Sequence, residues 1–364
     1  MKRYLIVFLM AVFSVTMAFA QADLQTVALV TLTKSEPITV RQLKTEIEKI
    51  VWQNIVTSTG RIPTTTEINS QVQKTSIDDR RQVLDVMIND RLAIQAAERD
   101  KITVTDNEVN QQITQLKAQM AQQIGRQPTD EEFATAVKNE TGQDLPAFRD
   151  AIKRQGIIQK YLLAKKQDLF SSVKEPTNEE IVNTYNLAKA QFVRPETVRF
   201  SMIQVPYGSD TASKNRAKEA ADRLVREIGS DPSKFDEAVI KSRTPNSGYQ
   251  AGDGGYVQRN QEYQQYLGAN FMNAAFSLRQ GEVSRLIEGI PGYQIIKITE
   301  TLPMKVLDLD EIAILGTSLT VRQYIAAGLL EQRQQEILER ATRELTTELR
   351  AGNPFRIMEN NLNW

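Results

Sequence analysis

The sequence predicts an α+β protein in which a mainly helical domain, formed by the N-terminal region and a C-terminal helix, holds an inserted α+β domain. Three observations indicate this organisation. Apolar residues follow the 3.6-residue period of a helix over most of residues 39–190, strand-like and glycine-rich segments begin near Val193, and a long amphipathic helix follows Leu307. A single helix cannot bury its apolar stripe alone, so we expect the last helix to pack on the N-terminal helices.

The first twenty residues have the features of a secretory signal peptide. Lys2 and Arg3 precede an apolar run from Leu5 to Phe19, and a small-x-small cleavage pattern ends at Ala20. A membrane anchor would need about 20 consecutive apolar residues, more than this run contains. We therefore expect cleavage after Ala20 and a periplasmic protein that does not insert into the membrane, provided that the cell has two membranes.

Composition excludes several classes of function. Without Lys2 and Arg3 the net charge is about −2, which gives no field to hold nucleic acid. The chain has no histidine and no cysteine, so it has no Ser-His-Asp triad, cysteine nucleophile, His/Cys zinc site or disulfide. A site made only of carboxylates stays open, but no acidic cluster stands out in the sequence. We expect neither a metal nor a cofactor, since the glycine-rich "AGDGGY" lacks the Gly-Lys-Ser/Thr ending of a phosphate loop.

Start signals define the elements of the N-terminal region, residues 21–192. A short strand is expected from Val27 to Leu32, and residues 57–70, "TSTGRIPTTTEINS", are interpreted as a loop or helix entry. A threonine followed three residues later by Gln or Glu is a capping box, which marks a helix start. Such boxes begin at Thr39, Thr105, Thr129 and Thr177. Helices are therefore expected over roughly residues 39–55, 77–99, 105–124, 145–169 and 177–189, and a further helix is expected to begin at Thr129.

The α+β domain is expected over residues 193–303. Its predicted order is a strand at 197–205, helices at 211–228 and 232–240, a glycine-rich loop that leads into a strand, a short apolar helix, and a last strand from Tyr293 to Ile298. In the C-terminal segment, residues 304–364, a helix should run from Thr320 to about Arg350 and stop before Pro354. The following "FRIMEN" could add a strand beside residues 27–32.

This order of elements is similar to that of a known family. Residues 196–299 resemble a parvulin-type peptidyl-prolyl isomerase domain through "RFSMIQV", "FDEAVIKS", "GDGGYV", "FMNAAFSLRQGEVS" and "GYQIIKI". The segments "ALVTLTKSEPIT" and "RQVLDVMINDRLAIQAAERDKITVTDNEV" resemble the N-terminal chaperone domain of the periplasmic survival-protein (SurA-type) family, and "RQQEILERATRELTTELR" resembles its C-terminal helix. The resemblance implies a holdase for unfolded exported polypeptides, with outer-membrane protein precursors as the expected partners.

The resemblance also implies where an isomerase site would lie. Active parvulins carry two histidines, an Asp or Cys and a Ser or Thr around an apolar floor that holds the substrate proline ring. The histidines match Met202 and Gln294, the Asp or Cys matches about Thr244, and the Ser or Thr matches Pro291. The Phe, Met and Leu of the floor match Phe271, Leu267 and Gly254.

These replacements predict weak or absent catalysis. Met202 and Pro291 offer no side-chain donor, and Gln294 and Thr244 are neutral. An active isomerase with an altered site is the alternative, and an envelope scaffold protein is a third hypothesis. The same positions also have structural interpretations: the apolar ones as core, Gln294 as a local hydrogen-bond partner between strands, and Asp253 as a turn residue.

Overall fold

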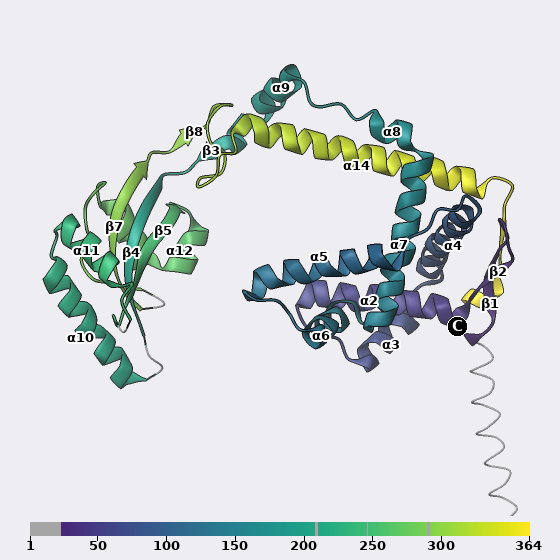
Figure 1. Ribbon diagram of the computed structural model, residues 1–364, viewed down its shortest axis with the longest axis horizontal. Helices are drawn as coiled ribbons and strands as arrows, with labels where there is room; N and C mark the ends of the chain where they lie inside the picture. Colours follow the sequence, from purple (N-terminus) through teal and green to yellow (C-terminus); the bar gives the residue numbers. More distant parts are fainter. Residues whose placement is uncertain (1–22, 208–209, 246, 290–291) are drawn as a thin grey trace, which may run out of the picture. The chain divides into compact units, whose positions relative to one another are not determined.

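The computed structural model describes residues 23–207, 210–245, 247–289 and 292–364, so the predicted signal peptide, its cleavage site and Pro291 lie outside the described residues. The chain forms two compact units, each labelled by its elements in Figure 1. The helical unit comprises the described part of Met1–Val173 together with Arg333–Trp364, and the inserted unit is Lys174–Gln332. The predicted α+β fold, with a mainly helical domain built from both chain ends around an insert, is confirmed.

The helical unit combines a helical body with a small antiparallel sheet. The strands pair in the order β2-β1-β9, and β9 lies beside β1 as expected, with Ala28 opposite Ile357. The strands are β1 (Thr26–Val30), β2 (Glu36–Thr39) and β9 (Phe355–Ile357). The helices are α2 (Val40–Thr59), α3 (Thr65–Lys74), α4 (Ile77–Arg99), α5 (Asp106–Ile124), α6 (Asp130–Thr141), α7 (Leu145–Lys165), α8 (Gln167–Ser171), the second part of α14 (Val321–Arg350) and the short η2 (Glu359–Leu362).

The predicted capping boxes form. At Thr39, Thr105, Thr129 and Thr177, the side chain accepts from the third backbone amide of the helix, and the Gln or Glu at that position accepts from the threonine amide. A further box, Thr64 with Glu67, starts α3 where the sequence was interpreted as a loop or helix entry. The predicted 145–169 helix ends earlier, at Lys165, and α8 follows as a separate turn.

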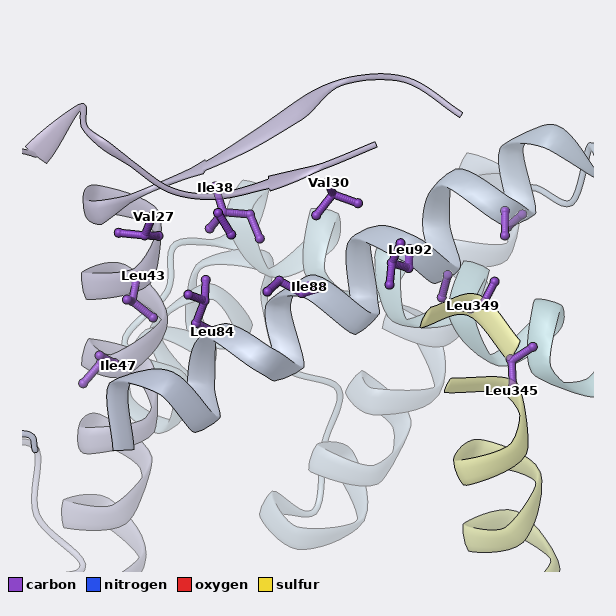
Figure 2. Packing of buried hydrophobic residues seen from close by; sticks show 14 of the residues in the cluster. Val27, Val30, Ile38, Leu43, Ile47, Leu84, Ile88, Leu92, Leu345 and Leu349 are labelled. Carbon is purple, nitrogen blue, oxygen red and sulfur yellow. The ribbon is translucent and has the colours of Figure 1, made fainter. Parts of the chain in front are cut away.

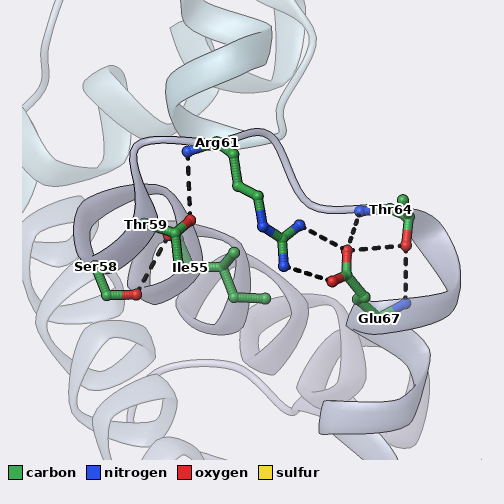
Figure 3. Close-up of polar contacts among 6 residues, drawn as sticks. All are labelled: Ile55, Ser58, Thr59, Arg61, Thr64 and Glu67. Atoms are coloured by element: carbon green, nitrogen blue, oxygen red, sulfur yellow. Dashed lines mark hydrogen bonds and ion pairs between the residues drawn. The ribbon is translucent and has the colours of Figure 1, made fainter.

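Two of these boxes belong to a repeated connector with the pattern Gly-Arg-x-Pro-Thr-x-x-Glu, at residues 60–67 and 125–132. In the first copy Gly60 ends α2 in the left-handed conformation, with φ of 68°. Figure 3 shows Arg61 reaching across the loop to Glu67, with an Nη1–Oε2 distance of 2.9 Å, while Glu67 also caps Thr64. The second copy makes the same Arg–Glu pair and the same cap. The connector therefore fixes the entry of α3 and of α6 with one carboxylate each.

These carboxylates make the helical unit sensitive to acid. The ion pair and the backbone cap lower the pKa of Glu67 and of Glu132 to about 2, and Lys160 and Thr105 do the same for Glu108. Because each pKa lies below its unfolded value of about 4.5, the stabilisation is complete above pH 4.5 and is lost as pH falls towards 2. We expect the melting temperature to fall steadily over that window, and Glu132→Gln to flatten the fall. An unchanged melting temperature down to pH 2.5 would contradict this assignment.

The main core joins the sheet, α4 and the end of α14. In Figure 2, Val27, Val30 and Ile38 point from the sheet towards α4, and Leu345 and Leu349 approach from α14. Salt bridges support this packing, because Lys166 contacts Glu348 at 2.7 Å and Arg350 pairs with Asp85. The buried α4 members of this core are Leu84, Ile88, Leu92, Ala93, Ala96 and Ala97.

The C-terminal residues are held by a buried arginine. Arg80 on α4 donates from Nη1 to the carbonyl of Leu362 at 2.7 Å, and its guanidinium lies 3.7 Å from the centroid of the Trp364 ring. Leu362 is fully buried in the same core as the sheet. The last residues of the chain are thus an integral part of the helical unit.

The inserted unit contains a four-stranded antiparallel sheet in the order β5-β4-β7-β6. The antiparallel strands β3 and β8 form a separate two-stranded ladder, in which Arg194 pairs with Lys305. The four-stranded sheet lies between these two strands in the sequence. The strands are β3 (Val193–Arg194), β4 (Thr197–Pro206), β5 (Gln250–Gln258), β6 (Ile287–Glu288), β7 (Gly292–Leu302) and β8 (Lys305–Val306). The helices are α9 (Asn178–Ala188), η1 (Lys189–Phe192), α10 (Thr211–Ile228), α11 (Pro232–Lys241), α12 (Gln261–Leu267), α13 (Ala269–Ser277) and the first part of α14.

The unit boundaries differ from the expected ones at 192/193 and 303/304. Helix α9 belongs to the inserted unit because Ile181 and Tyr185 pack in one cluster with Leu307, Val321 and Ile325. The Tyr185 hydroxyl also donates to the carbonyl of Leu307 at 3.1 Å. The start of α14 is therefore buried in the inserted unit and its end in the helical unit. None of the helices in the described ranges is long and apolar enough to cross a membrane.

Candidate functional site

The four-stranded sheet brings several of the candidate site residues to one face. Side chains alternate along a strand, so Phe200 and Met202 on β4 and Ile296 and Ile298 on β7 face the same side. Helix α13 covers that side and contributes the fully buried Phe271. Met202 and Leu267 pack at the edge of this cluster, half-buried. The structure thus brings Met202, Leu267 and Phe271 together.

A second phenylalanine fills the space beside Phe271. The rings of Phe200 and Phe271 meet edge to face with their centroids 5.0 Å apart. Phe200 also lies against Gly254, the extra residue of a β-bulge in β5. A Cβ on Gly254 would lie within 2.7 Å of Phe200 Cδ2, so the ring occupies the space that a larger residue would need. Sequence reasoning missed Phe200, although its spacing of two from Met202 placed it on the same face.

This close packing predicts that alanine substitutions at two nearby glycines differ strongly in their effect on the free energy of unfolding. Gly254→Ala forces Phe200 to move and should destabilise the inserted unit by about 1–3 kcal/mol through overpacking. Gly252→Ala is the matched control, because a Cβ there meets no atom within 4 Å. Urea unfolding of the two variants measures the difference. Equal stabilities would show that the Phe200 ring moves aside without cost.

Gln294 occupies a confined position on β7. Its side chain is 1% exposed and lies beside Gly289, where a Cβ would come within 2.5 Å of Gln294 Oε1. That oxygen has no hydrogen-bond donor among the described residues, so the local hydrogen bond expected for it is not found. A pocket of about 280 Å³ lies next to it, lined by the segments around Leu267 and Gly289.

The remaining candidates do not join this cluster. Thr244 is exposed after α11, and its hydroxyl donates to the carbonyl of Lys241 at 2.7 Å. Asp253 accepts from the amide of Gly255 at 3.1 Å and pairs with Arg199, which lowers the pKa of its carboxyl. Asp253 therefore makes the side-chain contact of an Asx turn, but it lies within β5 beside the bulge and not in the loop that was expected. Among the described residues, this face of the sheet is apolar and closely filled.

The helical unit contains a second candidate site, a groove of about 710 Å³ between α2, α4 and α7. Helix α4 packs on both α2 and α7, and Figure 1 labels all three helices. The groove was not predicted from the sequence, because its walls come from segments that are far apart along the chain. Its apolar lining residues are Ile50, Val83, Val86, Met87, Ile94, Ala151 and Ile158, and its charged ones are Arg41, Glu46, Lys49, Asp90, Arg91 and Arg154.

One carboxylate in the groove has an unusual environment. Asp90 is exposed to solvent, yet it lies in a groove that residues of three helices line. Loss of hydration, and to a smaller extent the nearby Glu46, raise the pKa of Asp90 to about 6, against the opposing pull of Arg154 and Arg91. The groove thus combines apolar walls with a carboxylate that is poorly compensated by its neighbours.

Comparison with known proteins gives the inserted unit a family. Residues 176–313 match the family of PPIC-type PPIASE domains. The match begins at α9 and ends before α14, so it covers most of the inserted unit. This includes both the sheet with its filled face and the β3–β8 ladder.

Relatives cover more of the chain. A protein named Chaperone SurA from Saccharophagus degradans is 25% identical over 259 residues, which are 66% of this chain and 56% of the relative. Foldase protein PrsA from Clostridium botulinum is 22% identical over 279 residues, or 74% and 72% of the two chains. The chain spans about half the length of the SurA relatives that it matches. A solved structure of a SurA-like chaperone from Campylobacter jejuni is 12% identical, covers 92% of this chain and 100% of its own, and has a TM-score of 0.37.

Proposed function

Since this chain is a relative of the SurA-type chaperones and carries a PPIC-type parvulin domain, we propose that it is a periplasmic holdase for unfolded exported polypeptides. The single observation that carries the proposal is the groove between α2, α4 and α7. A holdase needs apolar surface that accepts extended segments of many sequences without closing on them. The open, mixed lining of the groove meets that requirement.

We further propose that the clients are outer-membrane protein precursors. Strands of such barrels alternate apolar and polar side chains over about 10 residues. An extended segment of this kind can place its apolar side chains on Ile50 and Val86, which are 42% and 59% exposed. Its polar side chains can then meet the charged residues that line the same groove.

In this proposal the inserted unit contributes little or no prolyl isomerase activity. The two positions that match the family's histidines are Met202 and Gln294, and Phe200 fills the space beside Phe271. An active isomerase with an altered site is the competing function. No described feature of the sheet face favours it, since the side chains there lack a group that could tune the substrate carbonyl.

Aggregation assays test the proposed function. An unfolded outer-membrane barrel protein is diluted from urea into buffer that contains the chain from residue 21 onwards at equimolar concentration. Light scattering should fall well below that of the barrel protein alone. If scattering is unchanged while circular dichroism verifies the fold, the holdase proposal is wrong.

A further inference from the structure

Asp90 is an unpaired carboxylate at the centre of the groove. It has neither a hydrogen bond nor an ion pair within the described part of the chain. Two nearby cations have other partners: Lys49 pairs with Glu46 at 2.9 Å, and Arg91 pairs with Glu36 at 2.5 Å. The other two cations of the lining, Arg41 and Arg154, form no ion pair with Asp90 among the described residues. Asp90 therefore lacks a close cation of its own.

The residues around Asp90 have a regular spacing along α4. Val86, Asp90 and Ile94 lie four residues apart and line the groove from one face of the helix. Four residues of an α-helix rise about 6 Å. Alternate residues of an extended chain are about 6.6 Å apart, so their side chains match this spacing closely.

From this match we propose that the groove takes an extended polypeptide segment in which a Lys or Arg side chain, flanked two residues away on each side by apolar side chains, pairs with Asp90. The apolar side chains rest on Val86 and Ile94, and Ile50 and Ile158 form the opposite walls. This inference rests on the proposed holdase function and specifies which segments the groove prefers.

The unpaired Asp90 carboxylate favours a basic side chain at the central position, although the groove lining as a whole has more cations than carboxylates. A ligand cation beside Asp90 offsets the repulsion that Glu46 exerts on the charged carboxylate. It also replaces part of the stabilisation that this carboxylate lost with its hydration. Arg41 and Arg154 also line the groove and would attract an acidic side chain. A segment with a central glutamate is therefore the competing occupant, and the test includes it.

Three fluorescent ten-residue peptides test the proposal against the chain from residue 21 onwards. They share an alternating apolar and polar sequence without proline. They differ only at one central position, which has apolar residues two positions before and after it and carries lysine, norleucine or glutamate. At pH 7.5 and low salt, the lysine peptide should bind about three- to tenfold more tightly than the norleucine peptide. Asp90→Asn should remove this preference, whereas the control Asp78→Asn, on the same helix but outside the groove, should keep it.

The pH dependence of peptide binding is a second readout, which a purely structural role of Asp90 would not produce. The pKa of about 6 means that Asp90 is mostly charged at pH 7.5 and mostly protonated at pH 5. The other charged groups that face it are Arg41, Glu46 and Lys49 from α2, Arg91 from α4 and Arg154 from α7. The lysine preference should fade as pH falls through about 6, and Asp90→Asn should show no such change over this range.

The outcomes separate this inference from the function on which it rests. Equal affinity for the lysine and norleucine peptides, or tighter binding of the glutamate peptide, overturns the inference even if aggregation is suppressed. A lysine preference that survives Asp90→Asn overturns it as well. If none of the peptides binds and aggregation is not suppressed, the holdase proposal fails together with the inference.

Discussion

Removal of residues 333–364 is expected to unfold the helical unit, although all of its N-terminal helices remain. The deletion takes away Ala341, Leu345, Leu349 and Leu362, which are buried in the core that holds the sheet and α4. It also removes β9 and leaves Arg80 without the carbonyl that it contacts. Loss of one buried leucine costs about 2–5 kcal/mol, and an entire domain is stable by about 5–15 kcal/mol.

A matched pair of point substitutions on α14 measures the same effect without a deletion. Leu345→Ala should lower the free energy of unfolding by about 2–5 kcal/mol, because this side chain is 6% exposed in the core. Leu338→Ala, on the same helix but 48% exposed, should cost well under half of that. Thermal unfolding followed by circular dichroism gives both values. Equal small effects would mean that α14 does not complete the helical unit.

The inserted unit is expected to isomerise prolyl peptides with a kcat/KM at least about 100-fold below that of an active parvulin, since loss of one stabilising donor costs about 10²–10³ in rate. The barrier of about 18–20 kcal/mol comes from amide resonance, and an enzyme must favour the twisted amide to lower it. Here Met202 and Gln294 replace the donors that the resemblance implies, and the Phe200 ring packs edge to face on Phe271.

A direct assay on a proline peptide, with an active parvulin measured beside it, gives this ratio. The protease-free form of the assay is preferred, because a coupling protease could also cut the chain itself. A kcat/KM within tenfold of the active enzyme would show that the filled face opens in solution. The inserted unit would then be a working isomerase.

Local sequence signals predicted much of the fold. Capping boxes such as Thr105 with Glu108 fixed helix starts to the residue, because both partners of the cap lie within one turn. The pairing of residues 355–357 with β1 was also predictable, since the preceding helix needed a host for its apolar stripe. Helix α3 was missed because only two apolar residues, Ile68 and Val72, mark its buried face, although its own capping box at Thr64 was readable.

The candidate sites were less predictable because they depend on packing between distant segments. The matches to Met202, Leu267 and Phe271 identified one face of the sheet, but only the three-dimensional packing shows Phe200 across Gly254. Asp90 looked like any surface carboxylate of an amphipathic helix. Its pKa is raised by loss of hydration in the groove and by Glu46 of α2, and no local pattern relates α2 to this position of α4.

The central claim is that client binding belongs to the helical unit and does not need the isomerase-like sheet. The most direct test replaces residues 196–303 by a short glycine linker that joins the two strands of the β3–β8 ladder, where Arg194 pairs with Lys305. In the aggregation assay, this shortened chain should protect an unfolded barrel protein nearly as well as the full chain at the same molar ratio. Loss of protection, in a protein whose helical unit still melts at its normal temperature, would contradict the claim.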